Sequence, residues 1–239
     1  MSAAGAIVRP VLLVHGGRFA ASCWERLAPL LEHPVFAVDL PGRGARASVD
    51  LATVGIEACV EAVVEDAGGW DDIVLVGHSL AGVVLPGAAT ALGDRLARLV
   101  FVAAAVPLDG GCVFDTMSPE LHESVVANLV DGIYRPEGPS AASYLCNDMD
   151  DDATAFTLAC RVAESVRLLA EPVDLTATRS VPCTYVRLTL DATLPLGAQD
   201  RAAAALGDPD VVDLAAGHMA MVSAPGALAR IIEGARSAT

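Results

Sequence analysis

The stretch IVLVGHSLAGVVLPGAA, from Ile73 to Ala89, decides the fold of this sequence. It begins as an apolar run typical of a buried strand, changes at Gly77, and continues after Ser79 as a run typical of a helix. A serine at a sharp strand-to-helix turn has its hydroxyl pushed out of the fold, and the residues two before and two after it must be small. Gly77 and Ala81 meet that requirement, which favours a nucleophilic Ser79. The alternative is a serine that only caps the helix.

The same turn predicts a place for negative charge. Amides in the first turn of a helix have no acceptor within the helix and lie at the positive end of its dipole, so the Leu80 amide can point at an oxygen that gains charge. A second amide has to come from a loop after an earlier strand. The stretch VLLVHGG ends in two glycines and makes Gly17 the candidate, with an ordinary Gly-Gly turn as the alternative.

A base for the serine is expected in GHMAMVSAPGALARII, near the end of the chain. His218 follows a short strand candidate and precedes the last helix, so we expect an exposed loop histidine, and histidine is the side chain best suited to act as a base near neutral pH. The other histidines are expected to be structural or exposed. They are His15 in the glycine turn, His78 beside Ser79, His33 and His122.

The carboxylate that orients this imidazole is expected at Asp191. It follows the apolar run CTYVRLTL at the carboxyl end of a strand, the edge where Ser79 and His218 should also lie. The order Ser, Asp, His along the chain is the one expected when the serine lies in such a turn. The remaining candidates, Asp200, Asp208 and Asp213, fall within or beyond neighbouring elements and are expected to be surface charges or local caps.

Apolar runs of strand length alternate with helix-length stretches, which predicts an α/β fold with a mostly parallel sheet covered on both faces. The expected strands are Val11–Val14, Val35–Val38, Ile73–Val76, Leu99–Ala103, Cys183–Leu190 and Val211–Leu214. The expected helices are Cys23–Leu31, Leu51–Ala67, Leu80–Leu92, Ala198–Leu206 and Ala224–Ala235.

The alternation breaks between about Leu108 and Glu171. We therefore predict a core of residues 1–107 and 172–239 and a mainly helical cap of residues 108–171 over the carboxyl edge of the sheet. Four of the ten aromatic residues lie in this cap, which mildly favours an apolar pocket; they are Phe114, Tyr134, Tyr144 and Phe156. The acidic stretch NDMDDD lacks the spacing of a calcium loop and is expected to be a solvated turn.

Composition excludes several classes of protein. The 239 residues are 54% hydrophobic and 19% charged, which is globular, and no apolar run reaches the roughly 20 residues of a membrane helix. The net charge of −15 opposes nucleic-acid binding. No export signal or CxxC pair accompanies the six cysteines, so we expect free thiols and a cytoplasmic protein without metal or cofactor. A homodimer remains open.

The sequence resembles the α/β-hydrolase superfamily, in particular its plant methylesterase and hydroxynitrile-lyase-like branch, from about Val11 to Ala235. The resemblance is carried by VLLVHGGRFAASCWERLAPLLE, VFAVDLPGRG, VLVGHSLAG, LVFVAAAVPLDG, YVRLTLDATLP and GHMAMVSAPGALA. It implies an α/β-hydrolase fold with Ser79 as nucleophile, His218 as base, Asp191 as its partner, and the Gly17 and Leu80 amides as oxyanion hole. The cap matches poorly, so it implies no particular substrate.

These observations predict a serine hydrolase that cleaves a small or medium apolar carboxylic ester through an acyl-enzyme. Within the branch, nitrile lyases carry a lysine after the catalytic histidine, whereas this sequence has Met219 there and contains no lysine. Two alternatives stay open. One is a lyase, cyclase or lactone-forming or lactone-opening enzyme that uses the same pocket, and the other is a receptor that keeps a hydrolase-like pocket.

Overall fold

The computed structural model describes residues 9–135 and 141–234. Its centre is a six-stranded sheet in the order β2-β1-β3-β4-β8-β9, in which all neighbouring strands are parallel. This confirms the predicted α/β class. The strands are β1 Val11–Val14, β2 Val35–Val38, β3 Ile73–His78, β4 Leu96–Val102, β8 Cys183–Leu188 and β9 Asp210–Leu214.

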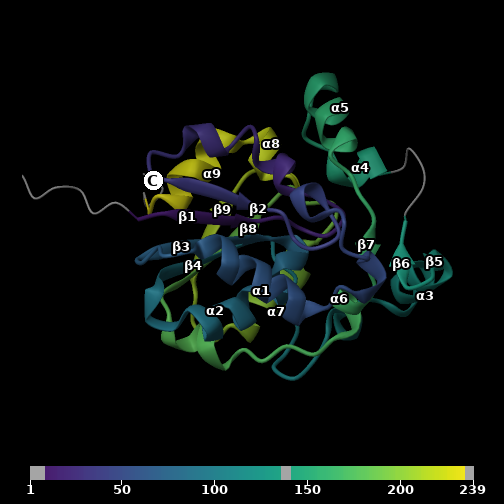
Figure 1. Cartoon of the computed structure of the whole chain (residues 1–239). Helices are drawn as coiled ribbons and strands as arrows, with labels where there is room; N and C mark the ends of the chain where they lie inside the picture. The colour runs from purple at the N-terminus through teal and green to yellow at the C-terminus, as the bar shows by residue number, and fades with distance from the viewer. Residues whose placement is uncertain (1–8, 136–140, 235–239) are drawn as a thin grey trace, which may run out of the picture.

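Helices cover both faces of the sheet, which explains why the central strands β1 and β3 are buried on both sides. In β1, Leu12 and Val14 pack into one buried cluster, and Val11 and Leu13 pack into the other. One face carries α1, α2 and α7, and the opposite face carries α8 and α9 (Figure 1). These helices are α1 Ile56–Ala67, α2 Leu85–Leu92, α7 Leu196–Ala205, α8 Ala220–Ser223 and α9 Pro225–Ile232.

Three predicted helices are interrupted. Residues 23–31 do not form one amphipathic helix but two 3₁₀ turns, Ala21–Trp24 and Ala28–Leu30, because Pro29 lacks the amide that a longer helix needs. The predicted helix at 80–92 is a 3₁₀ turn, Ser79–Val83, followed by α2, with a proline in the first turn of α2. The predicted helix at 51–67 breaks before α1, where Gly55 is extended.

Smaller corrections concern element ends. The strand predicted over 183–190 stops at Leu188, and the one predicted over 99–103 begins at Leu96 and ends at Val102. The last helix was predicted to reach Ala235, which lies outside the described residues. None of the six cysteines, all of which the structure describes, forms a disulfide. Within 9–135 and 141–234, no helix has the length and apolar character needed to cross a bilayer.

The segment predicted to form the cap lies beyond one end of the sheet, on the right in Figure 1. It is largely helical, but it also contains three two-residue strands that form a small antiparallel sheet in the order β5-β6-β7, which the sequence patterns did not indicate. Its helices are a 3₁₀ turn Val113–Thr116, α3 Pro119–Ala127, α4 Ala141–Leu145, α5 Asp151–Ala159 and α6 Arg167–Ala170. Its strands are β5 Leu129–Val130, β6 Ile133–Tyr134 and β7 Glu164–Ser165.

Candidate active site

Ser79 lies in a tight turn between β3 and the next helical turn. Its φ is +51°, a left-handed conformation that is rare and strained for a residue other than glycine. Small neighbours make the turn possible, because a Cβ on Gly77 would collide with the Leu85 side chain. A Cβ on Gly82 would collide with the Ala105 carbonyl, so the new helical turn packs closely behind β4. The predicted strand–serine–helix junction is present.

Three side chains from distant parts of the sequence meet at this turn. The Ser79 hydroxyl lies 3.0 Å from His218 Nε2, and His218 Nδ1 lies 2.7 Å from Asp191 Oδ2. A carboxylate can only accept, so Nδ1–H donates to Asp191, which leaves Nε2 free to accept the serine proton. The structure thus brings together the three residues predicted as nucleophile, base and orienting acid.

The Asp191 carboxylate is completely occupied. Its second oxygen, Oδ1, accepts the amides of Thr193 at 2.7 Å and Leu194 at 2.9 Å. The side chain is fully buried, whereas that of His218 is 3% exposed. The expectation of an exposed histidine was therefore wrong, because the ring packs against His78 and is bonded to Ser79 and Asp191. A fixed, buried carboxylate holds one imidazole tautomer and can stabilise its cation.

A second histidine, His78, packs against His218 and bonds its main chain. His78 is fully buried, its Nε2 lies 2.9 Å from the His218 carbonyl oxygen, and the two rings lie 4.6 Å apart. Burial, together with the nearby His218 ring, lowers the pKa of His78 well below its ordinary value. The neutral ring therefore donates Nε2–H to that carbonyl. This is the structural role expected for His78, and it fixes the loop that carries His218.

The two residues predicted to supply the oxyanion amides, Gly17 and Leu80, lie side by side. A Cβ on Gly17 would approach Leu80 Cδ2 to 2.8 Å and Leu80 Cβ to 3.2 Å, so the Gly17 backbone is packed against Leu80. A Cβ on Gly16 would lie 2.9 Å from Ser79 Cβ, which explains the glycine pair at this point. The turn after β1 thus reaches the serine itself.

His15 supports this turn from inside the core. It is buried, and one ring nitrogen, Nε2, accepts the Leu40 amide while Nδ1 donates to the Gly16 carbonyl. Burial and the positive charge of Arg43 lower its pKa to about 4. The neutral ring therefore connects the end of β1 to the chain beyond β2. His33 is partly exposed, and His122 is exposed and stacks on Phe114, as expected for residues outside the site.

Two residues of the cap hold the loops of the site, and sequence reasoning missed both. Asp148 Oδ2 accepts the Gly217 amide at 2.5 Å, and Asn147 Nδ2 donates to the Leu190 carbonyl at 2.8 Å. They therefore fix the residues immediately before His218 and Asp191. The NDMDDD stretch was expected to be a solvated turn. Asp151 and Asp152 are indeed exposed, but they begin helix α5, and Asp148 is partly buried against Gly217. Only the tertiary contact identifies it.

The aromatic residues of the cap do not gather into one apolar pocket. Phe114 stacks on His122 with ring centres 4.5 Å apart, Tyr134 lies under the Arg18 guanidinium, and Phe156 lies under that of Arg26. Tyr144, the fourth, packs at the edge of the core. Three of the four thus pair with polar groups, so these residues do not support the apolar pocket that their number suggested.

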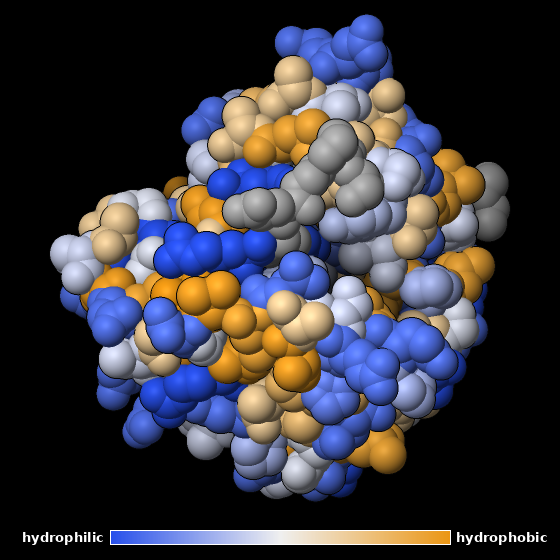
Figure 2. Space-filling view, turned by 90° about the vertical axis from the view of Figure 1, so that its right-hand side faces the viewer, coloured by the Kyte–Doolittle hydropathy of each residue, from blue (hydrophilic) through white to orange (hydrophobic). Residues whose placement is uncertain are grey.

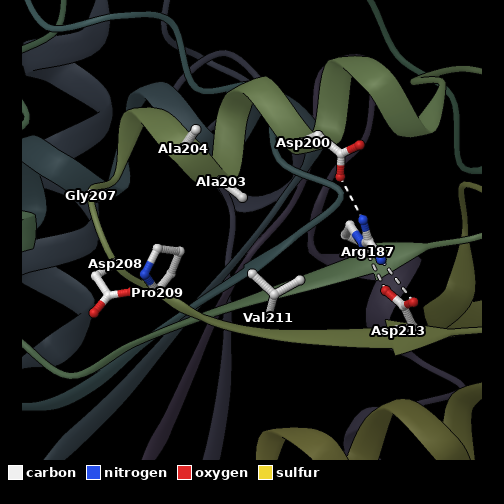
Figure 3. Close-up of a pocket in the computed structure, with 9 residues that line it drawn as sticks. All are labelled: Arg187, Asp200, Ala203, Ala204, Gly207, Asp208, Pro209, Val211 and Asp213. Atoms are coloured by element: carbon white, nitrogen blue, oxygen red, sulfur yellow. Dashed lines mark hydrogen bonds and ion pairs between the residues drawn. The ribbon is translucent and has the colours of Figure 1, made fainter.

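An open hollow of about 630 Å³ lies between α7 and β9 (Figure 3). Arg187 in its wall is bound by Asp200 at 2.6 Å and by Asp213 at 2.7 Å, so its charge is already paired. The surface role expected for these two aspartates is confirmed. The lining of the hollow includes neither Ser79, Asp191 nor His218. Across the described parts of the chain, no group of three or more His, Cys, Asp or Glu side chains gathers as a metal site.

Comparisons with curated proteins point to one family. The model of the alpha/beta hydrolase family matches residues 11–231. The chain is 30% identical over 128 residues to a carbendazim hydrolyzing esterase of Nocardioides sp. (strain SG-4G). The aligned region is 52% of this chain and 53% of the relative. It is 35% identical over 102 residues to methylesterase 9 of Arabidopsis thaliana, covering 40% of each. In these matches the chain spans about half the relative or less.

A longer match is lipase LipV of Mycobacterium tuberculosis, 28% identical over 93% of this chain and 91% of the relative. Among solved structures, an extracellular alpha/beta-hydrolase from a Paenibacillus species superposes with a TM-score of 0.86 at 24% identity, over 96% of this chain and 99% of the other. A pyrethroid hydrolase from Sphingobium faniae JZ-2 gives 0.79 at 23% identity, over 95% and 96%. The fold, the serine turn and the family match agree, and the chain belongs to the alpha/beta hydrolase family.

Proposed function

We propose that the protein is a serine esterase that cleaves a small or medium apolar carboxylic ester. The observation that carries the proposal is the relay from Ser79 Oγ to His218 Nε2 at 3.0 Å and from His218 Nδ1 to Asp191 Oδ2 at 2.7 Å. Hydrogen-bond reach between nucleophile, base and orienting acid is the geometry that acyl transfer requires. The esterase, methylesterase and lipase among the relatives support the same reaction class.

In the proposed mechanism, Ser79 Oγ attacks the ester carbonyl carbon while its proton moves to His218 Nε2. The carbonyl oxygen becomes an oxyanion and accepts hydrogen bonds from the Gly17 and Leu80 amides. The tetrahedral intermediate then expels the alcohol, which takes the proton from His218, and an ester to Ser79 remains. Water, deprotonated by His218, attacks this acyl-enzyme. The second tetrahedral intermediate releases the acid, and Ser79 Oγ takes the proton back from His218. Asp191 stabilises the imidazolium in both halves.

An apolar substrate is supported by the surface on the side of the cap. Figure 2 shows hydrophobic surface gathered near the middle of that face, next to strongly hydrophilic areas. Exposed apolar side chains of the cap include Leu121, Val126 and Val130. The residue after His218 is Met219, which is fully buried and apolar, so no cation follows the base. We also place the protein in a reducing compartment such as the cytoplasm, because its six thiols are unpaired.

The test is hydrolysis of p-nitrophenyl esters of graded chain length, together with methyl esters of aromatic acids, by the wild type and by Ser79→Ala. We expect hydrolysis by the wild type, a preference for short or medium acyl chains, and a loss of at least about 10³-fold in kcat in the variant. A fluorophosphonate should label Ser79, and mass spectrometry should detect the acyl-enzyme. Equal hydrolysis by Ser79→Ala would refute the proposal, and turnover without an acyl-enzyme would favour the lyase alternative.

A further inference from the structure

Glu164, in cap strand β7, contacts the turn that carries the candidate oxyanion amide. Its Oε2 accepts the Arg18 amide at 2.9 Å, and Arg18 directly follows Gly17. A Cβ on Gly17 would lie only 3.3 Å from the same oxygen. The carboxylate therefore lies against the turn after β1, although 146 residues separate it from Arg18 in the sequence.

The cap contacts Arg18 through its amide, its carbonyl and its side chain. Besides the bond to its amide, the Arg18 carbonyl accepts the Val162 amide at 2.8 Å, and its guanidinium lies 5.6 Å above the Tyr134 ring. Arg18 has a φ of +65°, a conformation that a non-glycine residue keeps only when its surroundings hold it there. All three of these contacts come from the cap, so the cap sets the shape of this turn.

Arg43 fixes Glu164 in turn. Its two terminal nitrogens bind the two carboxylate oxygens at 2.6 and 2.9 Å, and the side chains are only 1% and 2% exposed. The Ser165 amide also donates to Oε1 at 2.9 Å. The pair borders a narrow gap next to Gly17 and Leu80 that has no room for a water molecule. A bidentate pair in such surroundings is geometrically well defined and little screened.

We propose that Glu164, held by Arg43, is a positioning residue. It fixes the turn after β1, so that a strand of the cap determines the direction in which the Gly17 amide points. The proposal rests on the proposed esterase function. A well-placed donor acts on the transition state more than on the bound ester. Loosening the turn is therefore expected to lower kcat while KM changes little, which a contact that only stabilises the fold would not do.

The experiment compares Glu164→Ala, Glu164→Gln and the wild type. The alanine variant removes the acceptor for the Arg18 amide, whereas glutamine keeps an oxygen there and loses the charge. We expect kcat to fall about 10- to 100-fold in Glu164→Ala with KM within about threefold, and by less in Glu164→Gln. The labelling rate of Ser79 by a fluorophosphonate, whose phosphoryl oxygen occupies the same place, should fall in parallel.

The matched control is Asp152→Asn. Asp152 forms another ion pair between cap and core, with Arg26 at 2.5 Å, but it is exposed and touches no part of the turn. This variant should keep the wild-type kcat and labelling rate. If folded Glu164→Ala and Glu164→Gln behave like this control, the positioning role is refuted.

A second readout does not depend on turnover. In ¹⁵N-labelled protein, hydrogen exchange of the Gly17 and Arg18 amides should speed up in Glu164→Gln but not in Asp152→Asn. Unchanged exchange would overturn the proposal, even if Glu164→Ala fails to fold. Failure of the proposed esterase function would give a different result, because the wild type would then neither hydrolyse esters nor be labelled at Ser79. The hydrogen-exchange measurement would still decide whether Glu164 holds the turn.

Discussion

Protonation of His15 is expected to be a major cost of acidification for this protein. The folded protein lowers the pKa of His15 from 6.5 to about 4, through burial and the positive charge of Arg43. Below pH 6.5 the unfolded chain therefore takes up a proton that the folded state resists, so stability falls with pH. The part of the free energy of unfolding that comes from a neutral His15 is fully present above pH 6.5. It is lost progressively as the pH falls toward 4.

The magnitude follows from the two pKa values. Each pKa unit corresponds to about 1.4 kcal/mol, so His15 alone should remove about 3 kcal/mol of the free energy of unfolding between pH 7 and pH 4. That is a large share of the roughly 5–15 kcal/mol by which a domain is stable. Protonation also takes away the nitrogen that accepts the Leu40 amide, so the charged ring would leave a buried donor without a partner.

The assay is urea unfolding of the wild type and His15→Asn at several pH values from 7.5 to 4. Asparagine can still donate toward the Gly16 carbonyl but does not titrate. The wild type should be the more stable protein at pH 7.5, and its advantage should shrink by about 3 kcal/mol at pH 4. All other titrating groups are common to both proteins and cancel in the difference. An advantage that stays constant over this range would refute the reasoning.

Three further predictions concern the site and its support. Asp191→Asn should keep the fold but lower kcat by about 10³- to 10⁴-fold, measured with p-nitrophenyl esters, because the wrong imidazole tautomer is then held; an activity within tenfold of wild type would contradict this. Gly217→Ala should lower kcat at least about tenfold, because its Cβ would collide with the Asp148 carboxylate, whereas Gly226→Ala, with no atom closer than 3.9 Å, should not. Tyr185→Phe should lower the free energy of unfolding by about 1–2 kcal/mol in urea titrations, because its buried hydroxyl donates to a main-chain carbonyl at 2.8 Å; no loss would show that this carbonyl finds another partner.

The parts of the fold that depend on local pattern could be predicted from the sequence. Strands buried on both faces are recognisable as short apolar runs, and the strand–serine–helix turn requires small residues that are visible at Gly77 and Ala81. Loops at the carboxyl ends of parallel strands converge on one edge, so the meeting of Ser79, Asp191 and His218 followed from their positions in the chain. The distances between their atoms bear out that meeting.

What could not be predicted depends on contacts between distant segments. The roles of Asp148 and Glu164 leave no local signal in the sequence, because each carboxylate accepts a distant amide. The amide lies 69 residues from Asp148 and 146 residues from Glu164. The burial of His218 likewise results from side chains distant in the sequence, such as His78 and Ser79. The short strands β5, β6 and β7 are too brief for periodicity to reveal. Local helical patterns misled where a proline or a glycine interrupts them, as at Pro29 and Gly55.

The position of the last two strands has a consequence for how activity is lost. Asp191 follows β8 and His218 follows β9, and β9 is an edge strand bonded on one side only, with three of its five residues exposed. A strand bonded on one side only and largely exposed can open locally, at a free energy below that of global unfolding. Local opening of β9 would move the His218 ring away from the Ser79 hydroxyl while the rest of the sheet stays intact. Heat inactivation should therefore precede the loss of helical circular dichroism.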